Sequence, residues 1–185
     1  VDAPEMEIEV LEVVEVDAEG RLVALVTFDP DDRRAANEEM LERFSRSDAV
    51  RYVPAAGFEV LRATFAHDLD RLRAALPDDF VCDDHRRTGM GRLDGADSYV
   101  AAMAVLFELA PGVIHELLYL IAVEQHGFLD VSHTLGTLAT GGEFETVAVH
   151  LVLFSADRFA RMELYELEDL DVARARFEAL RPDRA

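Results

Sequence analysis

Charged and titratable side chains are concentrated between Asp78 and Gly95, where Asp83-Asp84-His85-Arg86-Arg87 places two acids, an imidazole and two cations in five consecutive residues. A carboxylate in such a cluster can take up a proton, and an imidazole can polarise or protonate an oxygen. The arginines can bind a carboxylate or a phosphate on a ligand, or can neutralise the nearby acids. This stretch is therefore the first candidate for a site.

The cluster follows a short β-prone run, Phe80-Val81-Cys82, bounded by Asp-Asp before it and by Arg and Gly after it. Successive side chains of a strand point to opposite faces. At most one of Asp83 and Asp84 can then face a core or pocket.

Other residues that could bind a metal or a cofactor do not form a recognisable motif. His115 and His133 fall on different predicted strands, and neither an HExxH motif nor an i, i+4 histidine pair occurs. Gly89-Met-Gly91 lacks the third glycine of a dinucleotide fingerprint, so it is interpreted as a flexible loop. We expect neither a metal nor a cofactor.

Composition excludes several function classes. A net charge of −20, from 38 acids and 18 bases, opposes binding to nucleic acid or to an anionic membrane surface. The longest apolar run, Tyr99 to Phe107, is far shorter than the roughly 20 residues that span a bilayer. With a lone Cys82 and no signal peptide, a cytoplasmic location is expected. Because the first residue is Val1 rather than Met, we expect the chain to be part of a longer polypeptide.

The first half of the chain predicts a hairpin followed by helices. Residues 7–16 and 22–28 alternate as two strands around an acidic turn, and the aspartates at 29–32 suit the start of a helix. After a break at 54–57, apolar residues keep a helical period to Pro77, with an interruption near His67-Asp68.

The second half predicts a helix, a meander of strands and a closing helix. Residues 96–109 form an amphipathic helix, and residues 113–123, 128–138, 144–154 and 159–165 are long β-type runs separated by short turns. Long strands joined by short turns predict a strongly twisted antiparallel sheet, which the helices at 58–76 and 96–109 can cover on its concave side. Residues 169–180 close the chain as a helix.

A similarity between two stretches of the sequence indicates that the chain has two parts. The strings that start at Arg21 and Arg158 share the plan strand, aromatic, acidic turn, helix, at an offset of 137 residues. Residues 1–50 are therefore interpreted as the last hairpin and helix of an upstream copy, and residues 51–185 as one complete domain. The alternative is that two hairpin-plus-helix units look alike by chance.

The order of elements over residues 57–167 resembles the NTF2-like superfamily, in its SnoaL-like and ketosteroid-isomerase-like branch. The residues that carry the resemblance are Asp78-Asp79-Phe80-Val81-Cys82-Asp83-Asp84, and Leu93-Asp94-Gly95 before the next helix. The resemblance implies an α+β fold with a cone-like, strongly curved antiparallel sheet, here preceded by a β-hairpin and a helix. It also implies that Asp84 stands where the isomerases have their general base, and that His150 replaces their second, oxyanion-binding acid.

The chain departs from the isomerases at a third position. Their oxyanion tyrosine falls near Val60 here, and neither Tyr52 nor Tyr99 replaces it. Asp84 and His150 still form a possible acid/base pair, and the alternative is that Asp84 is an exposed acid paired with Arg86 or Arg87 while His150 is a core histidine. Ligand-binding positions are predicted at His85, Arg86, Arg87, Phe58, Phe107 and Tyr119.

Three functions remain open. The first is binding or sensing of a small apolar molecule with a carbonyl or carboxylate, within a larger regulatory protein. The second is a SnoaL-like isomerase, cyclase or hydrolase that uses Asp84 as its base, and the third is a dimerisation module without a ligand. A homodimer is expected through the outer sheet face, because the β-runs, such as the one with Val147, Val149, Leu151 and Leu153, have two apolar faces to bury and helices are expected to cover only one.

Overall fold

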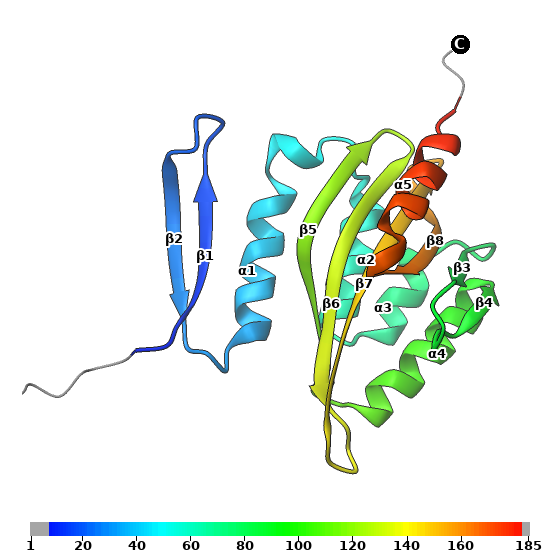
Figure 1. The fold of residues 1–185 in the computed structure, drawn as a ribbon, viewed down its shortest axis with the longest axis horizontal. Helices are drawn as coiled ribbons and strands as arrows, with labels where there is room; N and C mark the ends of the chain where they lie inside the picture. The colour runs from blue at the N-terminus through cyan, green and yellow to red at the C-terminus, as the bar shows by residue number, and fades with distance from the viewer. Residues whose placement is uncertain (1–7, 183–185) are drawn as a thin grey trace, which may run out of the picture. The chain divides into compact units, whose positions relative to one another are not determined.

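The structure is a computed structural model that describes residues 8–182, and it divides into two compact units, the first ending at Ser47 and the second beginning at Asp48. Figure 1 shows the fold of the two units.

The first unit is a β-hairpin with one helix. Strand β1 (Leu11–Val16) pairs antiparallel with β2 (Leu22–Phe28), and α1 (Arg33–Ser45) packs on both. The Asp17 carboxylate accepts hydrogen bonds from the backbone N–H groups of Glu19 and Arg21, which fixes the acidic turn. The predicted hairpin and helix are confirmed.

The second unit contains six strands, four α-helices and two short 3-10 helices (η) among its described residues. In chain order they are η1 (Asp48–Val50), α2 (Ala55–Phe65), α3 (Leu69–Ala75), β3 (Val81–Asp84), β4 (Gly91–Asp94), α4 (Ala96–Leu109), β5 (Ile114–Glu124), β6 (Gly127–Thr137), β7 (Glu143–Ser155), β8 (Arg158–Glu166), η2 (Leu167–Asp169) and α5 (Leu170–Ala179). The helix break predicted near His67 is confirmed: His67 has a positive φ of 56°, and the Asp68 side chain accepts a hydrogen bond from Arg71 N–H to cap α3.

The strands form one open, curved sheet in the order β4-β3-β8-β7-β6-β5. The meander β5 to β8 is antiparallel as predicted, but β3 pairs parallel with β8, so the sheet is mixed rather than wholly antiparallel. Strand β4 is not among the predicted strands, and its first residue, Gly91, belongs to the predicted loop. Asp94 and Leu93 pair with Val81 and Cys82, and α4 begins at Ala96, as predicted.

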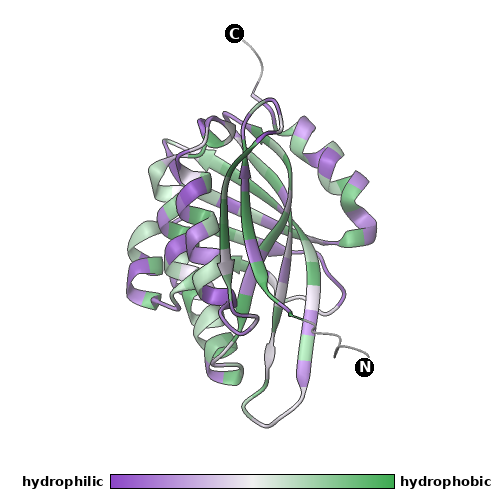
Figure 2. Ribbon diagram, turned by 90° about the vertical axis from the view of Figure 1, so that its left-hand side faces the viewer, coloured by the Kyte–Doolittle hydropathy of each residue, from purple (hydrophilic) through white to green (hydrophobic). Residues whose placement is uncertain are grey.

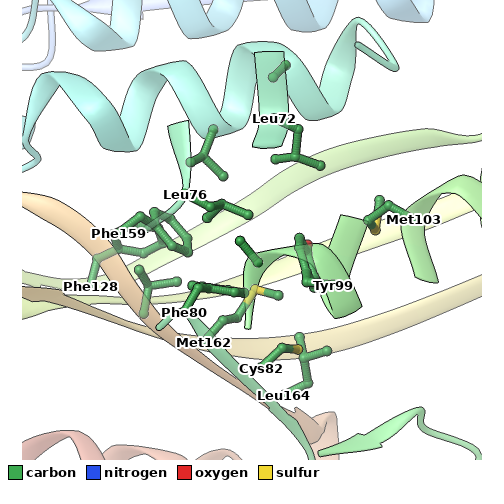
Figure 3. Packing of buried hydrophobic residues seen from close by; sticks show 14 residues of the cluster. Leu72, Leu76, Phe80, Cys82, Tyr99, Met103, Phe128, Phe159, Met162 and Leu164 are labelled. Atoms are coloured by element: carbon green, nitrogen blue, oxygen red, sulfur yellow. The ribbon is translucent and has the colours of Figure 1, made fainter. Parts of the chain in front are cut away.

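Helices α2, α3 and α4 cover one face of the sheet, which we call the inner face. Their buried residues meet those of the strands in one apolar cluster, in which Phe80 packs edge-on to Tyr99 with ring centroids 5.1 Å apart. Figure 3 shows Phe80, Cys82 and Met162 gathered beneath the helices. The placement of these helices on one face agrees with the prediction.

The opposite face, the outer face, carries a second apolar cluster under α5. Ala173 and Phe177 pack on Leu129, Val149 and Leu151, all of which are almost fully buried. The premise that helices cover only one face is therefore wrong, because the closing helix buries much of the outer face within the chain. Figure 2 shows the resulting pattern, with hydrophobic residues along the strands and hydrophilic residues interspersed on the helices.

Within the described part of the chain, none of the helices has the length and apolar character needed to cross a membrane.

Candidate functional site

A row of polar side chains crosses the inner face of the sheet. Asp130 on β6 pairs in register with His150 on β7, His150 pairs with Leu164 on β8, and Leu164 pairs with Asp84 on β3. Cross-strand neighbours in register point to the same face. The predicted residues Asp84 and His150 therefore share this face, but they are two strands apart, at about 10 Å from strand to strand.

The hydrogen-bond partners of the Asp84 carboxylate lie in the turn that follows it, between β3 and β4. Both of its carboxylate oxygens accept hydrogen bonds from Arg86, through Nε and Nη2 at 2.8 Å each, and Met90 N–H donates a further bond at 3.0 Å. Burial alone would raise the pKa of Asp84, but these hydrogen bonds and the Arg86 charge lower it below its usual value. A buried carboxylate that is paired in this way is a weak base.

Gly89 closes the turn over Asp84. A Cβ added at Gly89 would overlap the Asp84 carboxyl group, so the backbone can pass this close to the carboxylate only without a side chain. The prediction that only one of the two acids faces inward is confirmed, because Asp84 is 5% exposed while Asp83 pairs on the other face with Arg161 at 3.3 Å. The ion pair of Asp84 with Arg86 thus stabilises the turn between β3 and β4.

Asp130 is the carboxylate that lies beside His150. It is 3% exposed, and the Ser132 hydroxyl donates a hydrogen bond to its Oδ1 at 2.7 Å. Burial raises the pKa of Asp130 from 3.8 to about 7, although the Ser132 hydrogen bond acts in the opposite direction. At neutral pH this side chain can therefore either donate or accept a proton.

The pKa of His150 is shifted in the opposite direction, downward. Its Nδ1 lies 3.6 Å from Asp130 Oδ1, and 24% of its side chain remains exposed. Burial lowers the pKa of His150 from 6.5 to about 3, with His115 and Arg86 adding to the effect and Asp84 opposing it. The imidazole is therefore neutral near pH 7, with one nitrogen that can donate and one that can accept.

Polar and apolar side chains surround this pair on the same face. His115 Nδ1 lies 3.0 Å from Thr134 Oγ1, and burial lowers the pKa of His115 to about 4. The Phe107 ring stacks on His67 at 4.0 Å between centroids. Further partly buried apolar residues pack against the adjoining core cluster: Val100, Leu106, Phe107 and Leu120. This combination of apolar side chains with a few polar groups is typical of small-molecule sites.

The structure separates the other predicted ligand-binding residues. Arg86 is on the inner side in the Asp84 ion pair, whereas His85 stacks on Tyr165 and approaches Glu163 at 3.8 Å on the outer face. Tyr119 pairs in register with Val131, an outer-face residue, and is 66% exposed. These two are not part of the inner-face site.

Two more predicted ligand-binding residues take other roles. Arg87 is an exposed residue paired with Glu168, and Phe58 is buried in α2 with Arg62 over its ring. Of the six predicted positions, Arg86 contacts the polar row through Asp84, and Phe107 packs against the inner-face cluster and His67.

The two histidines considered for a metal lie on opposite faces. His115 is on the inner face, and His133 on the outer face lies between Glu116 and Glu145, at 3.5 and 3.4 Å. Across residues 8–182, no cluster of three or more His, Cys, Asp or Glu side chains has the geometry of a metal site.

Sequence reasoning missed Asp130, the most perturbed carboxylate of the site. Its signal in the sequence is an acid inside the run Phe128-Leu129-Asp130-Val131, two residues after the apolar Phe128 on the same strand. Phe128, two residues earlier on the same face of β6, is buried, so the Asp130 side chain points toward the core. A buried acid in this setting is a candidate functional group.

Comparison with known proteins identifies the fold. No model of a protein family and no curated protein matches the sequence. The second unit is similar in structure to a Mycobacterium tuberculosis protein solved in complex with estradiol-17β-hemisuccinate, with a TM-score of 0.53, 16% identity, and 62% of this chain and 93% of that chain covered. A Catenulispora acidiphila protein with a ketosteroid-isomerase-like fold gives a TM-score of 0.52 at 12% identity, with 64% and 90% covered.

A third similar structure, from Jannaschia sp. CCS1, is described as a SnoaL-like polyketide cyclase. It gives a TM-score of 0.50 at 17% identity, with 74% of this chain and 98% of that chain covered. At such identities the likeness establishes the fold alone. The fold is NTF2-like, as the sequence resemblance implied.

Proposed function

We propose that the inner face of the second unit binds a small, largely apolar molecule through a carbonyl or hydroxyl oxygen placed at Asp130 and His150. The observation that carries this proposal is the pair formed by the buried Asp130 and the partly exposed His150, at 3.6 Å, beside an apolar cluster on the same face of the sheet. Asp130 already accepts a hydrogen bond from Ser132, and a ligand oxygen can form a further hydrogen bond with Asp130 and one with His150.

The ligand's charge follows from the ionisation of the pair. With His150 neutral and Asp130 able to carry a proton, the pair suits a neutral oxygen better than a carboxylate placed directly against it. Arg86 is neutralised by Asp84 and offers little to an anion. We therefore expect a steroid-like or polycyclic alcohol or ketone rather than a small acid.

Binding can be tested by calorimetry with estradiol-17β-hemisuccinate and a neutral cyclic enone as probes. Asp130→Asn and His150→Asn are expected to weaken binding at least about tenfold, since each removes a hydrogen-bond partner from a buried site. Glu145→Gln and His133→Asn are matched controls, because they change the same residue types on the outer face. Equal affinity in all five proteins would remove the proposal.

A second candidate is catalysis of proton transfer, with Asp130 rather than Asp84 as the base. The pKa of Asp130, about 7, favours it, because a general base works best when its pKa is near the working pH. A panel of enolisable ketones and cyclic enones would test this candidate. Turnover that is lost in Asp130→Asn and retained in Asp84→Asn would support it, and turnover lost only in Asp84→Asn would contradict it.

Sensing within a larger regulatory protein, and dimerisation, stay predictions for this unit. Neither changes the binding proposal, which concerns the inner face of one copy.

A further inference from the structure

The hairpin of the first unit exposes an apolar surface on the face away from α1. Its members, all more than 49% exposed, are Val14, Val16, Leu22 and Leu25. They lie together, because Val14 pairs with Leu25 and Val16 pairs with Leu22. We call these four residues the hairpin face. A contiguous apolar surface of this kind marks an interaction site.

The hairpin matches β7–β8 of the second unit residue by residue. Val14 with Leu25 corresponds to Val152 with Met162, and Val16 with Leu22 corresponds to Phe154 with Phe159. Both hairpins have an irregularity at the same point, between Glu15 and Val16 in one and between Leu153 and Phe154 in the other. A β-bulge bends a strand at one defined position. A bulge at the same position in both hairpins is therefore a specific similarity between them.

The helix that follows also matches. Strand β2 corresponds to β8 with an offset of 137 residues, and the same offset joins the first residue of α1, Arg33, to the first residue of α5, Leu170. Each helix packs back on its own hairpin, α1 on β1 and β2, and α5 on β7 and β8. Chance similarity of two hairpins does not account for the matched pairing, bulge and helix start together.

The correspondence shows what the hairpin face lacks. Its counterparts Val152, Phe159 and Met162 are 1%, 3% and 7% exposed, because they lie in the apolar cluster beneath α2, α3 and α4. The hairpin also has two free edges among the described residues, whereas β7 and β8 are flanked by β6 and β3. An isolated two-stranded sheet is only marginally stable in water.

We propose that residues 8–46 are the closing hairpin and helix of a second NTF2-like unit, and that the hairpin face binds the helical layer of that unit. In the second unit of this chain, every element that completes the sheet and covers its inner face precedes β7 in the sequence. The same chain order places the missing elements N-terminal to β1. The occupant is therefore an upstream stretch of the same polypeptide with amphipathic helices like α2 and α4.

The proposal is tested by comparing residues 1–185 with the longer product of the same reading frame. Hydrogen exchange over residues 11–28 is measured in both, in the wild type and in the double variant Val14→Asp, Leu25→Asp. Val172→Asp in α5 is the matched control, because that valine is equally exposed, at 58%, and lies outside the hairpin. Unmodified protein gives an answer even if the double variant does not fold.

In the longer protein we expect slow exchange over residues 11–28, accelerated at least about tenfold by the double substitution, which would bury two charges. In residues 1–185 the same substitution should change exchange by less than about twofold, since the face is already in water. A reading frame with no upstream stretch comparable to residues 48–142 would overturn the proposal. Equal effects in both proteins would also overturn it, by showing that this chain or a second copy covers the face.

Discussion

At the scale of single residues, the Asp130–His150 pair has two opposite consequences for stability. The pKa of Asp130 is raised to about 7, so its contribution is fully present below its ordinary pKa of 3.8 and is lost as pH rises through 7. The pKa of His150 is lowered to about 3, so its contribution is present above 6.5 and is lost as pH falls through 3. The two slopes oppose each other, and single variants are needed to separate them.

Asp130→Asn isolates the first slope. Because asparagine does not titrate, the unfolding free energy of the wild type relative to the variant should fall by about 2–3 kcal/mol between pH 5 and pH 8. Urea titrations at several pH values measure it. A flat difference for Asp130→Asn would contradict the raised pKa.

Gly89→Ala tests how closely the β3–β4 turn fits over Asp84. The added methyl group would overlap the Asp84 carboxyl group, so the ion pair with Arg86 must shift, at a cost of about 1–3 kcal/mol. Gly112→Ala is the matched control, because a Cβ there meets nothing within 4 Å. Thermal unfolding that ranks the two variants equally would show that the turn is looser than described.

At the scale of elements, the local pattern of apolar residues predicted most of the helices and strands. It failed for elements whose structure or position depends on the elements they pair or pack with. The hairpin, α4 and the meander follow from periodicity, since each carries its own apolar stripe. Strand β4 has only Leu93 as an apolar side chain, and it is a strand because it pairs with β3. The place of α5 on the outer face likewise depends on which face α2 to α4 leave free, which no local pattern contains.

Phe177→Ala tests whether α5 is part of the outer-face core. Phe177 is 1% exposed and its ring stacks on His126, so the substitution should cost about 3–5 kcal/mol of unfolding free energy. Val172→Ala, at an exposed position of the same helix, should cost well under 1 kcal/mol. A small loss at Phe177 would indicate that α5 docks only loosely.

The polar row shows why the site was only partly predictable. The resemblance points to His150 and Asp84, and strand alternation predicts only that at most one of Asp83 and Asp84 faces inward. The neighbour of His150 depends on the register of β6 with β7, which aligns Asp130 opposite it. A register shift of one residue would put Leu129 or Val131 there instead, so the sequence alone could not select the pair.

At the scale of the whole molecule, a homodimer stays a prediction. Helix α5 buries much of the outer face, but Leu118 and Tyr119 of β5 remain exposed, at 41% and 66%. Light scattering at micromolar concentration should give twice the chain mass of 20.6 kDa, and Tyr119→Asp should shift the species toward the monomer. A single species at 20.6 kDa in the wild type would remove the prediction.

The central claim, that ligands bind at Asp130 and His150, is tested most directly by NMR of those two side chains. On addition of estradiol-17β-hemisuccinate, the Asp130 carboxyl carbon and the His150 ring nitrogens should shift, while those of Glu145 and His133 on the outer face stay fixed. Saturable shifts at the inner-face pair alone are the result that the structure predicts. Saturable binding that leaves Asp130 and His150 unshifted would contradict the claim.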